Sequence, residues 1–216
     1  MMAEQRKKPT KTRKEATIPL CGSTFDEFKE RVREFHGFTA PGVLIGGFMV
    51  DLAWRRLPKE TRFEAISETP KCLPDAVQLL TPCTIGNGWL TIVDTGRYAL
   101  CFYDKESGRG VRVAVDAALL EAWPEIKSWF FKLTPKKEQD FEALMREIRE
   151  AGASYCTVRP VTVTPRPPKG EGRRFALCPS CGESYPLSHG SRCLGCQGAD
   201  PYGGSGKKPS RLSRKA

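Results

Sequence analysis

Histidine and long apolar runs are both scarce in this sequence. His36 and His189 are the only two histidines among the 216 residues, so imidazole ligands can come from these two positions alone. The longest apolar run, residues 43–50, is stopped by Asp51 and is too short to span a bilayer. Residues 1–15 contain no apolar stretch, which argues against a secretory signal there. We therefore expect a cytoplasmic protein without membrane contact.

Cysteine does not follow the pattern of a disulfide framework. The chain has nine cysteines, an odd number, and four of them form two Cys-x-x-Cys pairs near the C-terminus. The other five are scattered through the rest of the chain. This usage indicates a reducing compartment and a bound metal rather than a set of disulfides.

The net charge of +10 is concentrated at the two ends of the chain. Residues 1–15 carry six Lys/Arg and two Glu, and residues 197–216 carry five Lys/Arg and one Asp, so each end has a net charge of +4. The segment between them is close to neutral, at +2. We expect a disordered basic arm over 1–16 and a disordered basic tail over 199–216, and such segments attract nucleic acid through its phosphates.

A linker rich in proline and glycine, residues 165–174, divides the chain into a main domain over 17–164 and a small domain over 175–198. Apolar periodicity in the main domain predicts helices over 25–36 and 41–57, a short helix from 74 and another after 135, with strands over 90–94, 98–103, 111–115 and 155–164. Short turns join the three middle strands, which predicts an antiparallel meander. The expected fold class is α+β, with an antiparallel sheet flanked by helices.

His36 lies where the first predicted helix ends and the second, mostly apolar helix begins after Pro41. Two interpretations are open at this point: the imidazole caps or packs at a helix end, or it faces a pocket formed by the two helix ends. Gly46 and Gly47 inside the second helix each cost about 1 kcal/mol relative to alanine. A closely packed neighbouring backbone is the simplest compensation.

The strongest chemical signal is a pair of knuckles with metal-ligand spacing. Cys178 and Cys181 form the first, and Cys193 and Cys196 form the second. Four thiolates at this spacing match a tetrahedral zinc ribbon, with iron as the alternative metal, and a closed four-thiolate site indicates a structural role. The segment is too small for a core of its own, so the ion should supply its folding energy. His189 lies between the knuckles, where a surface position is expected.

The main domain has no such spacing. Its metal-capable residues include His36, Cys72, Cys83 and Cys101, which the spacing alone does not join. Reduced buried cysteines behave as small apolar residues, and this is the default interpretation for Cys72, Cys101 and Cys156.

Several segments together resemble the FmdE family, the E-subunit family of formylmethanofuran dehydrogenase. The family pattern runs Phe-His-Gly-His-x-Cys-Pro-Gly, Asp-Ala-Ile-Gln and Thr-Gly-Cys-Thr-x-Gly-Lys-Gly. Here residues 35–42 read Phe-His-Gly-Phe-Thr-Ala-Pro-Gly, 75–78 read Asp-Ala-Val-Gln, and 81–88 read Thr-Pro-Cys-Thr-Ile-Gly-Asn-Gly. Residues 102–113 also match, and 178–183 match the Cys-x-x-Cys-Gly-Glu with which the ribbon of many members begins. The resemblance covers about residues 24–197 in the same order.

The resemblance implies an α+β domain followed by a zinc ribbon, a homodimer, and a core pocket whose candidates are His36 and Cys83. Phe38 stands where the family has its second histidine, and Ala40 stands where it has the motif cysteine. Two side chains cannot close a metal site, although Cys72, Asp75 or a dimer partner would be able to complete one. We therefore expect one structural zinc in the ribbon and no second metal in the core domain.

These observations suggest a zinc-binding accessory protein without catalytic activity, linked to a molybdenum or tungsten metalloenzyme or to metal handling. Its partners would be a second copy of the chain and subunits of the metalloenzyme. One alternative is a zinc-ribbon protein that binds nucleic acid through the basic ends. Another is an enzyme that uses Cys83 as nucleophile and His36 as base, which requires the two side chains to lie within hydrogen-bond reach.

Overall fold

The computed structural model describes residues 20–58, 61–164 and 174–202. Two compact units divide the chain, Met1–Pro165 and Arg166–Ala216. The predicted arm over 1–16, nearly all of the linker and most of the tail lie outside the described residues. No helix in the described part of the chain combines the length and the apolar character that crossing a membrane requires.

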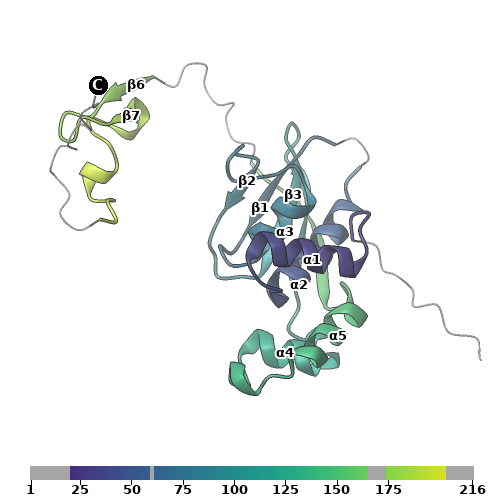
Figure 1. The fold of residues 1–216 in the computed structure, drawn as a ribbon. Coiled ribbons are helices and arrows are strands. Elements are labelled where there is room, and N and C mark those ends of the chain that lie inside the picture. Colours follow the sequence, from purple (N-terminus) through teal and green to yellow (C-terminus); the bar gives the residue numbers. More distant parts are fainter. Residues whose placement is uncertain (1–19, 59–60, 165–173, 203–216) are drawn as a thin grey trace, which may run out of the picture. The chain divides into compact units, whose positions relative to one another are not determined.

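The first unit is an α+β domain, as the sequence predicts (Figure 1). Its helices and strands, in chain order, are α1 (Phe25–His36), α2 (Pro41–Trp54), β1 (Phe63–Ser67), α3 (Leu73–Leu80), β2 (Leu90–Ile92), β3 (Ala99–Asp104), β4 (Arg109–Val115), α4 (Pro124–Phe131), α5 (Phe141–Ala151) and β5 (Cys156–Thr162). Figure 1 shows α1, α2 and α3 grouped beside the strands and α4 and α5 together at one end.

The sheet has the strand order β2-β1-β3-β4-β5. The predicted meander is correct for β3, β4 and β5, which pair antiparallel, but it is wrong for β2, which pairs in parallel with β1. Strand β1 is not predicted by the sequence pattern, because its buried positions are held by the small residues Ala65 and Ser67 and its segment is otherwise polar. Its insertion between β2 and β3 is therefore a result of tertiary structure.

Local signals set the start of α1. The Thr24 hydroxyl accepts a hydrogen bond from the Glu27 amide at 3.2 Å, and the Glu27 carboxylate accepts one from the Thr24 amide at 2.7 Å. This reciprocal capping box satisfies two amides that the helix itself leaves unpaired. The predicted apolar stripe is only partly internal, because Phe25, Phe28 and Val32 are buried whereas Phe35 is exposed.

Helix α2 is buried on nearly every side and lies at the centre of the core. It ends at Trp54, three residues before the predicted end at Leu57. Side chains, rather than the expected neighbouring backbone, occupy the space left by its two glycines. A Cβ atom added to Gly46 would lie 2.8 Å from the Cβ of Ala76, and one added to Gly47 would lie 2.3 Å from the ring of Phe28.

An ion pair within the first unit gives a prediction for acid stability. The Arg112 guanidinium hydrogen bonds to both carboxylate oxygens of Glu68, and the side chains are 13% and 10% exposed. The hydrogen bond from Arg112 lowers the pKa of Glu68 below its ordinary value of 4.5. Glu68 therefore adds stability above that value, and this stability is lost as the pH falls through the lower pKa of the folded state.

We expect Arg112→Met to destabilise the first unit by about 2 kcal/mol at pH 7, because Glu68 loses its principal partner while it stays buried. Urea unfolding of both proteins at pH 7 and pH 3 tests this. The difference between wild type and variant should shrink at pH 3, where Glu68 is protonated. An equal difference at the two pH values would contradict the assignment. Arg33, in an exposed pair with Glu30, provides the matched control Arg33→Met, for which no resolvable change is expected.

Candidate metal centre

The second unit begins with a short antiparallel hairpin that carries the first knuckle. Strands β6 (Phe175–Leu177) and β7 (Ser184–Pro186) pair, and Cys178 and Cys181 lie in the turn between them. The Gly182 amide donates to the Cys178 carbonyl at 2.8 Å, and Gly182 adopts a φ of 81°. That left-handed conformation is accessible to glycine with little strain, as the tight turn of a knuckle requires.

The second knuckle lies on a turn of 3₁₀-helix, Gly195–Gln197. The Gln197 amide donates to the Cys193 carbonyl at 3.1 Å. The side-chain amide of Gln197 reaches back to the carbonyls of His189 at 2.8 Å and Arg192 at 2.6 Å, and so ties down the loop between the knuckles. Cys196 lies on this turn beside Gln197, so the loop contacts help to position its thiol.

The four thiols predicted as zinc ligands lie together. The Sγ atoms of Cys178, Cys181, Cys193 and Cys196 all lie within 4.8 Å of one another. Cys181 Sγ and Cys193 Sγ are 3.7 Å apart. In a tetrahedral site with zinc–sulfur bonds of about 2.3 Å, two sulfurs are separated by roughly 3.8 Å. The donor set therefore fits zinc in both chemistry and spacing.

The electrostatics of the cluster also indicate a cation. Backbone N–H groups of Cys181 and Cys193 point at the Cys178 sulfur and lower the pKa of that thiol to about 6. The hydrogen bond with Cys193, together with burial, raises the pKa of Cys196 to about 12. Thiols this close cannot all ionise together unless a positive charge compensates them. A zinc ion would supply that charge and would hold the four thiolates in a closed, structural site.

Little else holds the second unit together. Tyr185 and Cys178 are its buried residues among those described, and the Tyr185 hydroxyl donates to the Gly190 carbonyl at 3.1 Å. His189 is exposed, as expected for a residue that is not a ligand. The metal site is therefore the main source of cohesion in this unit.

In the first unit, His36 has a different partner from the one that the resemblance suggested. Its ring nitrogen Nδ1 lies 2.6 Å from Oδ2 of Asp75, in the first turn of α3. The Phe38 ring meets the imidazole edge-on, with ring centres 4.9 Å apart, and is itself 56% exposed. Ala40 is buried at the N-terminus of α2. His36 thus joins the end of α1 to the start of α3.

Cys83 is fully buried behind α3. Its Sγ lies 3.6 Å from the carbonyl oxygen of Phe63, and its amide donates to the Thr81 hydroxyl at 3.0 Å. Burial raises the pKa of the Cys83 thiol to about 11. Thus the hydrogen-bond partners of Cys83 and of His36 differ. Within residues 20–58, 61–164 and 174–202, the cluster that gathers three or more metal-capable side chains is that of the four C-terminal cysteines.

Two features of the helix junction were not found by sequence reasoning. The Tyr98 hydroxyl donates to the Gly42 carbonyl at 2.5 Å, across 56 positions of sequence. A Cβ atom added to Gly42 would lie 2.9 Å from the Cβ of Cys72, whose φ is 54°. The Pro-Gly hinge therefore has a packing reason, and no local pattern points to these contacts.

The position of Cys83 predicts low reactivity. At pH 7.5 the native Cys83 thiol should react with iodoacetamide at least tenfold more slowly than a free thiol, because a pKa of about 11 leaves little thiolate. Peptide mapping by mass spectrometry after timed alkylation measures this, with the urea-unfolded chain as control. Rapid labelling of Cys83 in the native chain would instead support a nucleophile at this position.

Comparisons with known proteins agree with this architecture. A family model described as "FmdE, Molybdenum formylmethanofuran dehydrogenase operon" matches residues 35–164, and one described as "FmdE treble clef zinc finger" matches residues 169–203. The second match supports zinc binding and gives a treble clef as the family's description of the module that the sequence suggested as a ribbon.

A crystal structure of a tungsten formylmethanofuran dehydrogenase FmdE-like protein from Syntrophus aciditrophicus is 48% identical, with a TM-score of 0.79, and the match covers 87% of this chain and 100% of that one. A probable S-adenosyl-L-methionine-binding protein from Archaeoglobus fulgidus is 30% identical over 199 residues, which is 78% of this chain and 52% of that protein. The chain thus spans about half the length of this relative. The two family matches and the shared fold show that the chain belongs to the FmdE family and carries its zinc finger.

Proposed function

We propose that this protein is a zinc-binding accessory protein that acts with a molybdenum or tungsten formylmethanofuran dehydrogenase and has no catalytic activity of its own. The observation that carries the proposal is the arrangement of its thiols. The four cysteines of the zinc finger converge within 4.8 Å, whereas Cys83 is buried and the pKa of its thiol is raised. The chain therefore has a closed structural site and no activated thiol at Cys83.

The proposed assembly is a cytoplasmic homodimer with one zinc ion per chain. The family name and the related Syntrophus protein support the link to a tungsten or molybdenum enzyme. The name of the Archaeoglobus relative refers to S-adenosyl-L-methionine, but we assign no ligand from it, because the match covers 52% of that protein.

Binding to the purified enzyme tests this function. The full chain and purified formylmethanofuran dehydrogenase complex should co-elute in size-exclusion chromatography with a fixed stoichiometry, and the chain alone should have no dehydrogenase activity. Omission of the chain should lower the activity or the metal loading of the complex. Activity of the isolated chain, or no association at micromolar concentrations, would overturn the proposal. Light scattering on the chain alone tests the dimer.

The nucleic-acid alternative depends on the basic ends. Within residues 174–202, Arg174 and Arg192 are balanced by Glu183 and Asp200, so the described part of the zinc finger has no excess positive charge. Fluorescence titration with a 20-nucleotide DNA at several salt concentrations decides this point. Tight binding that weakens steeply with salt would favour the alternative, whereas no binding at 150 mM salt would remove it.

A further inference from the structure

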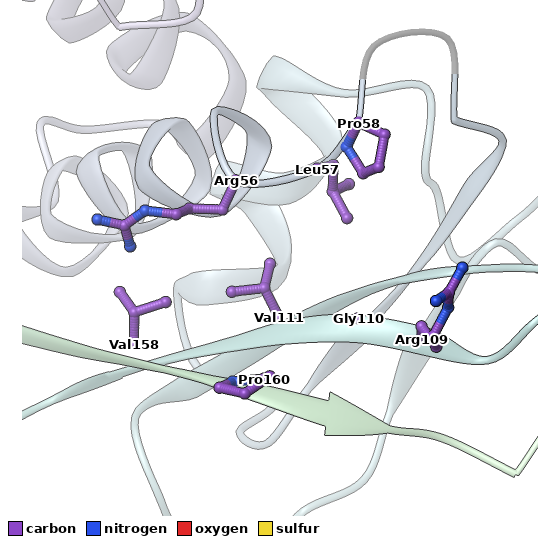
Figure 2. A pocket seen from close by; sticks show the side chains of 8 residues that line it. All are labelled: Arg56, Leu57, Pro58, Arg109, Gly110, Val111, Val158 and Pro160. Atoms are coloured by element: carbon purple, nitrogen blue, oxygen red, sulfur yellow. The ribbon is translucent and has the colours of Figure 1, made fainter.

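A pocket in the first unit lies apart from the helix junction and from the zinc finger. It has a volume of about 320 Å³ and lies between the segment that follows α2 and the strands β4 and β5 (Figure 2). Pockets for small molecules begin at roughly 300 Å³. The size therefore suits a small organic molecule.

The pocket is mainly apolar. Val111 and Pro160 are directly paired across β4 and β5, and Val158 lies on the same face of β5 two residues away. Figure 2 shows these three side chains beneath Leu57 and Pro58. A backbone hydrogen bond from the Leu57 amide to the Trp54 carbonyl, at 3.1 Å, helps to hold this segment above the strands. An apolar body can therefore bind between the two walls.

Positive charge lies at both ends of this apolar floor. Figure 2 shows Arg56 at one end and Arg109 at the other, both labelled among the pocket residues, and no acidic residue lines the pocket. Arg55, the neighbour of Arg56, is paired with Asp51 at 2.9 Å, but no such ion pair is found for Arg56 or Arg109 among the described residues.

Asp104 is a carboxylate that Arg109 attracts, but its oxygen is engaged elsewhere. Its Oδ1 accepts hydrogen bonds from the amide and the hydroxyl of Ser107, both at 2.7 Å. These bonds are the main reason for the lowered pKa of Asp104, and Arg109 contributes only a weaker, longer-range attraction. The Arg109 guanidinium thus keeps its donors for a ligand anion.

We propose that this pocket binds a small organic anion, in which a carboxylate or phosphate is held by Arg56 or Arg109 and an apolar body lies on Val111, Val158 and Pro160. A guanidinium recognises a carboxylate or phosphate with two parallel hydrogen bonds, and the apolar floor excludes water from the rest of the ligand. A cation of the same shape meets two positive charges and is rejected. This site is independent of the proposed accessory function.

Titration of the full chain with four matched eight-carbon probes tests the proposal. Octanoate and octyl phosphate should shift the amide resonances of Val111 and Val158 in ¹H–¹⁵N spectra. Octan-1-ol should bind at least tenfold more weakly, because it lacks the charge, and octylammonium should not bind. Equal affinity for octylammonium and octanoate, or shifts confined to other residues, would overturn the proposal.

Variants separate the pocket from general positive charge. Arg56→Gln or Arg109→Gln should weaken octanoate or octyl phosphate binding by about tenfold, the usual effect of losing one charge-assisted contact. Arg159→Gln is the matched control, because Arg159 lies between Val158 and Pro160 and points to the other face of β5. An equal loss in the control would overturn the assignment. Binding to phosphatidylglycerol vesicles but not to soluble octyl phosphate would do so as well, since it would indicate a membrane surface.

Discussion

Replacement of Cys178 by serine is expected to reduce the zinc content from one ion per chain to none and to unfold the second unit. The four thiols converge within 4.8 Å, and few other residues of this unit are buried. A structural zinc contributes an apparent binding free energy of about 10–16 kcal/mol, far more than such a small apolar core can. Metal analysis by mass spectrometry should show the loss, and amide resonances of residues 174–202 should collapse to unfolded positions.

The first unit should keep its spectrum in the same experiment, because residues 1–165 form a separate compact unit. Ser180→Ala, inside the same knuckle, is the matched control and should retain the ion. A metal equivalent that survives in Cys178→Ser would show that the core domain also binds metal. Retention of a folded zinc finger without metal would contradict the view that the ion supplies its folding energy.

The contact between Phe28 and Gly47 gives the second large effect. Phe28 is fully buried, and Phe28→Ala should cost about 3–5 kcal/mol of the free energy of unfolding. Gly47→Ala alone should cost about 1–2 kcal/mol, because a Cβ atom there lies 2.3 Å from the Phe28 ring and the clash exceeds the gain in helix propensity. In the Phe28→Ala background the same Gly47→Ala change should instead stabilise the protein by up to about 1 kcal/mol.

Urea unfolding followed by tryptophan fluorescence measures this cycle. All four tryptophans lie in the first unit, so the signal reports on that unit alone. Gly86→Ala is the control, because the nearest atom to an added Cβ there is 3.9 Å away. The change in sign is the decisive result. If the two substitutions were additive, Gly47 would not owe its place to Phe28.

Much of the local structure could be predicted from the sequence. The capping box at Thr24 predicted α1 with its observed bounds, since a cap and an apolar period act within a few residues. Strand β1 could not be predicted in the same way. Its register against β2 and β3 depends on pairing with residues far along the chain. Its own composition carries only a weak strand signal.

The candidate sites divide along the same line. The spacing of Cys178, Cys181, Cys193 and Cys196 was sufficient to predict that they converge, because a knuckle is a local turn. The partners of His36 and Cys83 were decided by tertiary structure. Asp75 reaches His36 because α3 begins where α1 ends, and the Phe63 carbonyl meets Cys83 because β1 lies inside the sheet.

The sequence by itself therefore determined the zinc finger, the first helices and the family, all of which depend on spacing and local pattern. Tertiary structure decided the order of the sheet, the burial of the Cys83 thiol and the pocket between Arg56 and Arg109. The physical reason is range. A turn or a cap is closed by neighbours in the chain, whereas the environment of a thiol or a guanidinium is set by residues that only folding brings near.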